Sequence, residues 1–439
     1  MPPLRHSAYL RSTLNSHSVI TDVACTLCGC VCDDLRISVQ ENRIVRAEGA
    51  CEIAEPWLLE QNTRWPPATR IAGQAVSWEE AIGRAGDILR SSLAPLIYGL
   101  SHSSTAGQRA AAHLADCLGA TIDTAASHRH APSIMALQQV GESTCSLGEV
   151  KNRCDLVVFW GANPVKSHPR HLERYSVEPR GLFTPQGRQD RFVIVVDVRH
   201  SETAEKADWF IQVEPNGDFE ILWALRTLIA GEAISSAVGG VSSDTLRTLA
   251  ERLQTCRSGI VFFGPGLTRH GAPHASVEAM LRLVKDLNKT TRFYARSMRP
   301  PGDAAGANNV LCWSTGFPFA VNLARGYPRY NPGEYFANDV LERGEADSCL
   351  IVVSESIAQL SEKAQRRLEQ IPTIVLDYPH TTCSLVPTVA FTTAVYGVHL
   401  PGTAYRMDET PIPLRPVLSC EYPSDSDVLE AIRAEVVRR

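Results

Sequence analysis

The sequence lacks the features that mark several classes of protein. It has no apolar run long enough to span a bilayer and no long block of lysine and arginine, and its formal net charge is -5. Neither a G-x-S-x-G nucleophile motif nor an H-E-x-x-H zinc motif occurs. We therefore expect no membrane span and no nucleic-acid partner, and no conventional catalytic set stands out.

A secretory signal is also missing from the N-terminal region. The first twenty residues contain Arg5 and Arg11 but no acid, and Ser, Thr, Asn and His interrupt any apolar stretch. We expect residues 1–20 to form a flexible arm. The thirteen cysteines of a large chain without a signal peptide favour metal or redox chemistry over disulfides, so the expected location is the reducing cytoplasm.

The length and the apolar pattern predict an α/β fold. A chain of 439 residues with 44% hydrophobic content needs two or three packed units. Short, continuously apolar segments alternate with helical patterns, which favours doubly wound, mostly parallel sheets. Strands are expected at residues 94–100, 155–160, 192–196, 258–263, 350–353 and 373–376. Helices are expected from residue 78, at 110–118 and at 424–439, and a hairpin at 35–45.

These elements predict a division of the chain into four parts. They are the arm at residues 1–20, a small Cys-rich β lobe at 21–75, an α/β domain at 76–255 and a second α/β domain at 256–439. Residues 176–191 are polar and contain two prolines and two glycines, which is typical of an exposed loop.

Five cysteines crowd into residues 25–51. Their spacing is Cys25-x2-Cys28-x3-Cys32-x18-Cys51, with Cys30 as an additional thiol. Four thiolates suit tetrahedral zinc or an iron–sulfur cube, but zinc sites usually contain two C-x2-C pairs, and here Cys51 stands alone. The spacing therefore favours a 4Fe-4S cluster. Zinc, or a set of free thiols without metal, remains the alternative.

Two loops that follow predicted strands are candidates for binding a nucleotide. Gly161-Ala162-Asn163-Pro164 follows one strand and Asp197-Val198-Arg199 follows the next. A glycine loop lets backbone N–H groups approach a phosphate, a strand-end Asp can accept hydrogen bonds from a guanine or ribose, and Arg199 can pair with phosphate. The alternative is that both loops are tight turns capped by their own side chains.

The cysteine spacing, these loops and a P-N-G-D turn at residues 215–218 resemble the molybdopterin-dinucleotide oxidoreductases. A further set of segments resembles one branch of them, the B subunit of formylmethanofuran dehydrogenase. The segments of that set, in chain order, are 131–133, 137–138, 148–153, 168–171, 325–334 and 402–408. The resemblance runs from about residue 20 to the end. It implies a molybdopterin-oxidoreductase-like fold that lacks the C-terminal barrel domain of larger relatives.

One position departs from the family pattern. In metal-dependent members a cysteine ligates tungsten or molybdenum within a stretch similar to A-S-x-C-H-G-P-S. Here the stretch reads ASHRHAPS, in an expected loop, with Arg129 at the ligand position. A guanidinium stays protonated and cannot bind the metal. We interpret Arg129, with its neighbours His128 and His130, as a vestigial metal position, and we expect no tungsten or molybdenum pterin. Substitution of the ligand by either histidine is the alternative.

The family has a second branch, and the resemblance to that branch implies a function for this chain. In it, a related chain is part of a formyltransferase/hydrolase complex, which moves a formyl group from formyl-tetrahydromethanopterin to a methanofuran-like carrier and releases formate. The resemblance implies an architectural subunit that is not itself catalytic, with an amidohydrolase-type hydrolase, a formyltransferase and a small repeat subunit as partners. The alternatives are an active tungsten or molybdenum formylmethanofuran dehydrogenase subunit and an iron–sulfur electron carrier.

A carrier with a glutamate-rich tail would favour basic surface. The residues expected to provide it are Lys166, His168, Arg170, His171 and Arg174, with Arg325 and Arg329 as a second group. The alternative is that they are ordinary solvated or ion-paired charges.

Overall fold

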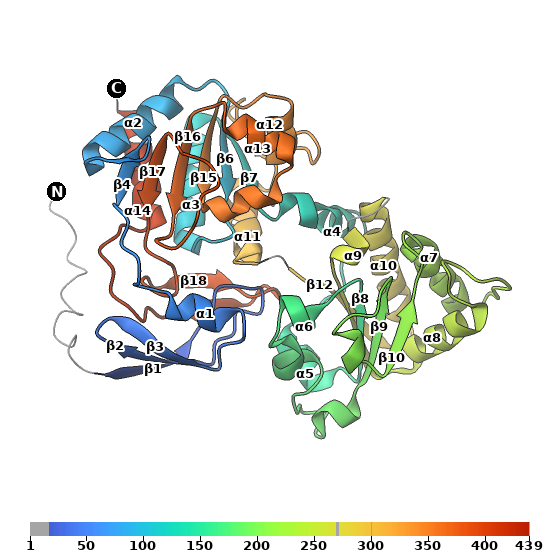
Figure 1. Ribbon diagram of the computed structural model, residues 1–439. Helices are drawn as coiled ribbons and strands as arrows, with labels where there is room; N and C mark the ends of the chain where they lie inside the picture. The colour runs from blue at the N-terminus through green and yellow to red at the C-terminus, as the bar shows by residue number, and fades with distance from the viewer. Residues whose placement is uncertain (1–16, 269–271, 300, 439) are drawn as a thin grey trace. The chain divides into compact units, whose positions relative to one another are not determined.

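The computed structural model describes residues 17–268, 272–299 and 301–438, and the chain divides into two compact units (Figure 1). Unit 1 consists of Met1–His128, Pro301–Arg406 and Pro411–Arg439, and unit 2 consists of Arg129–Pro300 and Met407–Thr410. This division differs from the predicted boundary between residues 255 and 256. The physical reason is that each main sheet contains strands from both sides of that boundary.

Unit 1 is built on a nine-stranded sheet with the order β14-β13-β7-β6-β15-β16-β17-β4-β5. Its central strands are parallel, and they are β7 (Thr121–Thr124), β6 (Pro95–Gly99), β15 (Ser348–Val352), β16 (Thr373–Asp377) and β17 (Val389–Thr392). The edge strands are short, and they are β14 (Arg329–Tyr330), β13 (Val321–Asn322), β4 (Thr69–Ile71) and β5 (Gln74–Ala75).

Helices cover both faces of this sheet, so its central strands are buried throughout. One face packs against α2 (Trp78–Ser91), α3 (Thr105–Leu118), α11 (Ala304–Thr315) and α14 (Asp425–Val437). The other packs against α12 (Ala337–Glu342), α13 (Glu362–Leu368) and η4 (Ser354–Gln359). Helix α2 buries a stripe of Ala81, Ala85, Ile88 and Leu89, and α14 begins with a capping box formed by Ser424 and Asp427.

A small β lobe lies in the N-terminal part of unit 1. Strands β1 (Ser18–Val23), β2 (Leu35–Gln40) and β3 (Arg43–Glu48) form an antiparallel sheet, followed by α1 (Ala54–Leu59). A hairpin of β18 (Gly402–Tyr405) and β19 (Pro411–Leu414) contributes to the same small core as Ala24 and Val31. The predicted hairpin at 35–45 is confirmed. Of the predicted arm, residues 1–16 lie outside the described residues, and the last three belong to β1.

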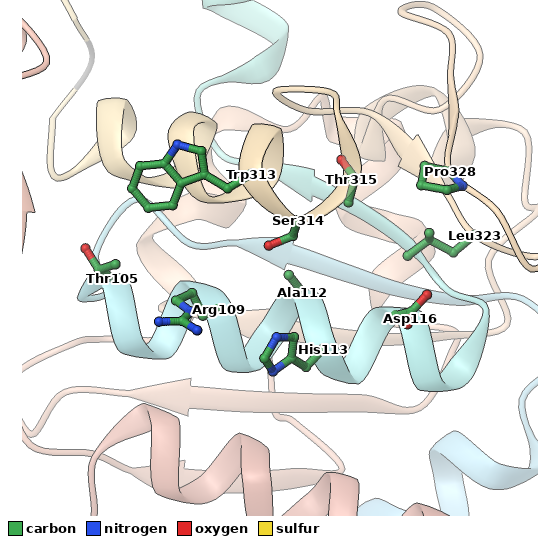
Figure 2. Close-up of a pocket in the computed structure, with 10 residues that line it drawn as sticks. All are labelled: Thr105, Arg109, Ala112, His113, Asp116, Trp313, Ser314, Thr315, Leu323 and Pro328. Carbon is green, nitrogen blue, oxygen red and sulfur yellow. The ribbon is translucent and has the colours of Figure 1, made fainter.

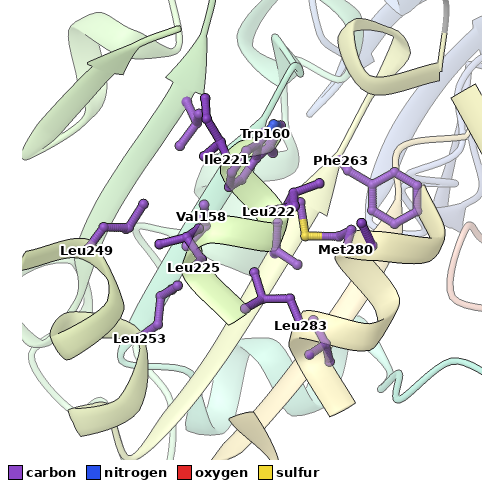
Figure 3. Close-up of a cluster of buried hydrophobic side chains, with 14 of the residues drawn as sticks. Val158, Trp160, Ile221, Leu222, Leu225, Leu249, Leu253, Phe263, Met280 and Leu283 are labelled. Atoms are coloured by element: carbon purple, nitrogen blue, oxygen red, sulfur yellow. The ribbon is translucent and has the colours of Figure 1, made fainter. Parts of the chain in front are cut away.

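Unit 2 is a second doubly wound unit. Its five strands are all parallel, in the order β10 (Trp209–Gln212), β9 (Phe192–Asp197), β8 (Leu156–Trp160), β11 (Ser258–Phe263) and β12 (Arg292–Ser297). Helices α7 (Asp218–Ile229), α8 (Ser243–Thr255) and α10 (Pro273–Leu287) cover one face. Figure 3 shows their side chains packed in one core with Val158, Trp160 and Phe263 of the sheet.

The remaining elements of the chain are short or connect the strands of unit 2. They are α4 (Ser127–Val140), α5 (Leu147–Arg153), α6 (Pro164–Ser167), η1 (Leu172–Ser176), η2 (Gly187–Asp190), η3 (Ala204–Lys206) and α9 (Pro265–Thr268). Every strand and helix predicted from the sequence is present, with ends shifted by a few residues. No helix among the described residues is both long and apolar enough to cross a membrane.

The predicted exposed loop at residues 176–191 is more ordered than expected. Arg191 is 3% exposed, and its guanidinium donates hydrogen bonds to the carbonyl oxygens of Val177, Pro179 and Lys151 and to the hydroxyl of Thr184. A single buried arginine therefore organises the segment, while Leu182 at its tip stays exposed.

A buried carboxylate at the end of β7 holds three chain segments of unit 1. Asp123 accepts hydrogen bonds from the backbone N–H groups of Thr124, Ala320 and Ala337 and from the Ser127 hydroxyl, at 2.7 to 3.0 Å. Its side chain is 1% exposed, so these donors replace the water that the carboxylate loses on folding.

Replacement of Asp123 by asparagine should destabilise the protein by about 2–4 kcal/mol, because one carboxylate oxygen becomes an NH₂ group that faces two buried donors. The free energy of unfolding in urea measures this. Asp116→Asn, the same change at an exposed position of α3, is the control and should have little effect. Equal stabilities of the two variants would contradict the role given to Asp123.

The second face of the unit 2 sheet packs against a buried histidine, His171, and the nearby His168 is also buried. The His171 ring lies edge-on to Phe262, with ring centroids 4.6 Å apart, and its Nδ1 shares a 3.0 Å hydrogen bond with the Ser176 hydroxyl. Burial lowers the pKa of His171 to about 3 and that of His168 to about 4. Both imidazoles are therefore neutral in the folded chain at pH 7.

These lowered pKa values predict loss of stability in acid. Protons bind the unfolded histidines near pH 6.5 but the folded ones only near pH 3–4, so stability is complete above pH 6.5 and falls below it. Each histidine should contribute a loss of roughly 2 kcal/mol between pH 6.5 and pH 5.

Urea unfolding at pH 7.5 and pH 5 measures this loss. His171→Gln should show a smaller pH dependence than the parent chain, whereas His274→Gln, at an exposed position of α10, should keep the parent's dependence. A His171→Gln variant with an unchanged pH dependence would rule out this origin of the acid sensitivity.

Candidate functional site

The β lobe brings the four candidate cysteine ligands to one end of its sheet. Val23 at the end of β1 pairs with Leu35 at the start of β2, and Glu48 at the end of β3 pairs with Arg36. The turn that carries Cys25 to Cys32 and the segment that carries Cys51 therefore leave the sheet at the same end. The grouping predicted from the spacing follows directly from this antiparallel register.

The thiols of this group influence one another. Cys30, the additional thiol of the sequence, is buried and makes side-chain hydrogen bonds with Cys28 and Cys32, and these bonds, with burial, raise its pKa. The bond from Cys30 lowers the pKa of Cys28. Burial raises the pKa of Cys25 and Cys51, and the charges of neighbouring thiolates raise both further.

Backbone N–H groups point at two of these sulfur atoms. The N–H of Leu27 is directed at Cys25, and those of Ile53 and Ala54 are directed at Cys51, and each of them lowers the pKa of the thiol that it faces. Among the described residues, no three His, Cys, Asp or Glu side chains are arranged to hold a single metal ion. The thiols are thus grouped without forming a closed mononuclear site.

The vestigial metal position lies at the start of a helix and not in the predicted loop. Residues 128–130 belong to the first turn of α4, and Arg129 is exposed. The side chain of His128 lies outside the part of the chain that the structure describes. Pro132 lies inside this helix, where its ring nitrogen cannot donate a backbone hydrogen bond.

His130 is bound on both sides by protein groups of unit 2. Its Nε2 accepts a hydrogen bond from the guanidinium of Arg299, and its Nδ1 lies 3.4 Å from the Ser297 hydroxyl. Arg299 also forms a 2.6 Å ion pair with Glu409. Burial and the charge of Arg299 lower the pKa of His130 well below its ordinary value. Both ring nitrogens are therefore occupied.

No pattern in the sequence points to these partners of His130. Arg299 is 169 positions from His130, and Glu409 is 110 positions from Arg299. The neighbouring Arg296 donates to the backbone carbonyl of Met407 at 2.5 Å, and Asp408 accepts from the backbone N–H of Leu147 at 2.6 Å. Charged side chains thus bond the segment 407–410 to the rest of unit 2.

The two candidate nucleotide-binding loops lie side by side at the carboxyl edge of the unit 2 sheet. The N–H of Gly161 donates to the carbonyl of Val196 at 2.9 Å, and the N–H of Gly266 donates to the carbonyl of Gly161 at 2.9 Å. Gly161 has a φ of 55°, and a Cβ there would lie 2.8 Å from the Cα of Gly266. Only glycine allows this close approach of the loops after β8 and β11.

The side chains of these loops bond mainly to each other. Asn163, which precedes Pro164 at the start of α6, donates to Glu202 and accepts from the Thr203 hydroxyl, both at 2.7 Å. Asp197 accepts from the backbone N–H of Arg199 at 3.3 Å. The Asn163 side chain therefore links the two loops, whereas Arg199 is exposed at the same edge.

A cavity of about 240 Å³ opens at the same edge of unit 2. It is lined by Asn216 and Asp218 of the predicted P-N-G-D turn, by Gly266, and by residues at the start of α10. Asp218 accepts a 2.6 Å hydrogen bond from Trp160 at the end of β8. The structure therefore brings together the loop at residues 161–164, the loop at residues 197–199 and the turn at residues 215–218. All three follow the carboxyl ends of parallel strands, where α/β sheets bind their ligands.

The predicted basic surface at residues 166–174 needs correction. His168 and His171 are buried, His171 against Phe262 of the sheet, and Arg170 pairs with Glu173 at 2.5 Å. Both imidazoles are neutral at pH 7, so they add no positive charge to the surface. Lys166 is exposed and lies 3.9 Å from Glu202.

Comparison with known proteins places the chain in a family. The family model described as molybdopterin oxidoreductase matches residues 66–315. The B subunit of the tungsten-containing formylmethanofuran dehydrogenase 2 of Methanocaldococcus jannaschii is 40% identical over 91% of this chain and 94% of its own. Its namesake from Methanococcus maripaludis is 37% identical over 95% of this chain and 99% of its own.

One subunit of a formyltransferase/hydrolase complex is also similar to this chain. The B subunit of that complex from Methylorubrum extorquens is 25% identical over 65% of this chain and 75% of its own. A chain of the crystal structure of FhcABCD from that organism, in complex with methylofuran, matches with a TM-score of 0.70 and 22% identity over 84% of this chain and 99% of its own.

A second solved structure, acetylene hydratase from Pelobacter acetylenicus, shares the fold, with a TM-score of 0.69 and 12% identity over 95% of this chain and 69% of its own. The order of motifs along the sequence, the two doubly wound units and the relatives agree. The chain belongs to the molybdopterin oxidoreductase family and, within it, to the family of formylmethanofuran dehydrogenase B subunits.

Proposed function

We propose that this chain is a non-redox, architectural B subunit of a formyltransferase/hydrolase-type assembly. In such an assembly the formyl group of formyl-tetrahydromethanopterin passes to a methanofuran-like carrier and leaves as formate. Separate hydrolase, formyltransferase and small repeat subunits would surround this chain. The observation that carries the proposal is Arg129, a permanently charged side chain at the position where the family places its metal-ligating thiolate.

Among the described side chains around Arg129, none is available as a substitute ligand for the metal. His130 already accepts from Arg299 and faces Ser297, so neither ring nitrogen is left for a metal without breaking the ion-paired cluster of Arg299 and Glu409. A second positive charge from Arg299 next to His130 also opposes a metal cation there. The described side chains at this position, those of Arg129 and His130, therefore do not fit a tungsten or molybdenum centre.

The β lobe, in contrast, fits an iron–sulfur cluster. A cube presents a separate iron atom to each of four thiolates, and the segments that carry Cys25 to Cys32 and Cys51 leave the sheet at the same end. The N–H groups directed at Cys25 and Cys51 would stabilise ligating thiolates. We infer that Cys25, Cys28, Cys32 and Cys51 hold a 4Fe-4S cluster with a structural role.

A second candidate function is an active formylmethanofuran dehydrogenase subunit. The observation in its favour is that identity to the tungsten-containing relatives is 40% and 37%, against 25% for the formyltransferase/hydrolase relative. Under this alternative the loops at Gly161 and Asp197 would hold the pterin nucleotide. We favour the first candidate because overall identity reflects the whole chain, whereas a single position decides whether the metal is bound.

Metal analysis of the native assembly separates the two functions. The assembly should be purified without oxygen through a tag on this chain and its metals measured by mass spectrometry. We expect about four iron atoms per chain, less than about one tenth of an atom of tungsten or molybdenum, and co-purifying hydrolase and transferase subunits. Tungsten or molybdenum close to one atom per chain would instead establish the oxidoreductase function.

The cluster assignment predicts a selective effect of cysteine replacement. Cys28→Ser and Cys51→Ser should each remove most of the iron, because a hydroxyl is a poor replacement for a thiolate. Cys117→Ser, at an exposed cysteine of α3, is the matched control and should retain the iron. Iron measurement and the visible absorption of the cluster test this, and equal iron in all three variants would refute the assignment.

A further inference from the structure

Unit 1 has a surface pocket that the proposed function does not use. The pocket has a volume of about 560 Å³ and lies between α3 and α11, which run along its two sides in Figure 2. Leu323 and Pro328, the two ends of the wall segment 323–328, line the remaining side. The lining residues are Thr105, Arg109, Ala112, His113, Asp116, Trp313, Ser314, Thr315, Leu323 and Pro328.

A large aromatic side chain is left exposed at this pocket. Trp313 of α11 is 59% exposed, and its ring meets the ring of Tyr405 edge-on, with centroids 5.8 Å apart. In the wall segment, Tyr327 is 54% exposed. Exposed Trp and Tyr side chains are uncommon on free surfaces and are enriched among the residues that dominate binding between proteins.

The lining carries one positive and one negative side chain, Arg109 and Asp116, and Figure 2 shows them at opposite ends of the pocket, with Arg109 on the side of Trp313. Arg109 of α3 is exposed and has no partner among the described residues, and Arg325 in the wall segment is also exposed. His113 lies 3.9 Å from Glu430 of α14, and Asp116 is the acidic residue of the lining. Arg109 beside the exposed ring of Trp313 is complementary to a partner that presents a carboxylate next to an apolar side chain.

The hydroxyl groups of the pocket argue against a small-molecule ligand. The Thr315 hydroxyl already donates to the carbonyl of Leu311 at 2.7 Å, and the Thr105 hydroxyl donates to the carbonyl of Thr403 at 3.1 Å. Small-molecule sites depend on several converging polar groups in a concave, mostly apolar site, and here few remain available. An open groove with exposed aromatic and arginine side chains suits a polypeptide better.

We propose that this pocket is the docking site of a neighbouring subunit of the assembly, which inserts a segment with an acidic and an apolar side chain. The carboxylate would pair with Arg109 and the apolar group would cover Trp313. The inference rests on the proposed function in one respect, that this chain works within a multi-subunit assembly. It adds the surface and the chemistry of the contact.

Hydroxyl-radical footprinting of the isolated chain and of the tagged native assembly tests the contact. Oxidation of Trp313 and Tyr327, read by mass spectrometry, should fall several-fold in the assembly. Equal oxidation of Trp313 in both samples would overturn the inference but leave the proposed function standing. A chain that co-purifies with no other subunit would overturn both, so the two failures are distinguishable.

A photo-reactive amino acid at Ser314, which lines the pocket, identifies the occupant. We expect cross-links to one other subunit, within a segment that contains Asp or Glu. Cross-links to a second copy of this chain, or to a segment without an acid, would overturn the inference, as would the absence of any cross-link.

Charge reversal completes the test. Arg109→Glu should weaken retention of the cross-linked subunit by about tenfold or more. Arg84→Glu, the same change at a position of α2 in the same unit, is the matched control and should retain it. Equal retention in both variants would overturn the role of Arg109, and loss in both would show that the effect is not specific to the pocket and would also overturn it.

Discussion

The fold of unit 1 depends on one pairing between distant strands. Pro95–Gly99 lies beside Ser348–Val352 in parallel, at the centre of the nine-stranded sheet, and all of unit 2 except Met407–Thr410 lies between them in the chain. Without this pairing β6 and β7 would have no sheet to join, and the helices on both faces would have no core to cover. Unit 2 needs no such partner, because its five strands come from one continuous segment.

This difference explains how much could be predicted from the sequence. Strands such as 156–160 and 258–263 were predictable because burial on both faces makes them apolar throughout, and the turn glycines and Ser caps mark their neighbours. The grouping of the four cysteines followed from local spacing. The boundary between the units could not be predicted, since it depends on which strands pair, and apolar strands of this kind carry no signal of their partner.

Side-chain environments were the least predictable part of the candidate site. The sequence H-P-R-H at residues 168–171 suggests positive surface, but whether a histidine faces water or a sheet depends on packing that the sequence alone does not express. The same holds for His130, whose partner Arg299 lies 169 positions away. Arg129 was different, since its meaning comes from the chemistry of the guanidinium group and from the family pattern, and neither depends on knowing the tertiary structure.

The insertion of unit 2 also sets the order in which the chain can fold as it leaves the ribosome. Strand β6 is finished long before β15 is translated, and at 5–20 residues per second the delay is on the order of 10–50 s. Throughout that interval β6 and β7 expose apolar faces and unpaired edges, whereas most of unit 2 can fold as soon as β12 emerges. The nascent N-terminal half is therefore a natural client for chaperones until the strands after unit 2 have been made.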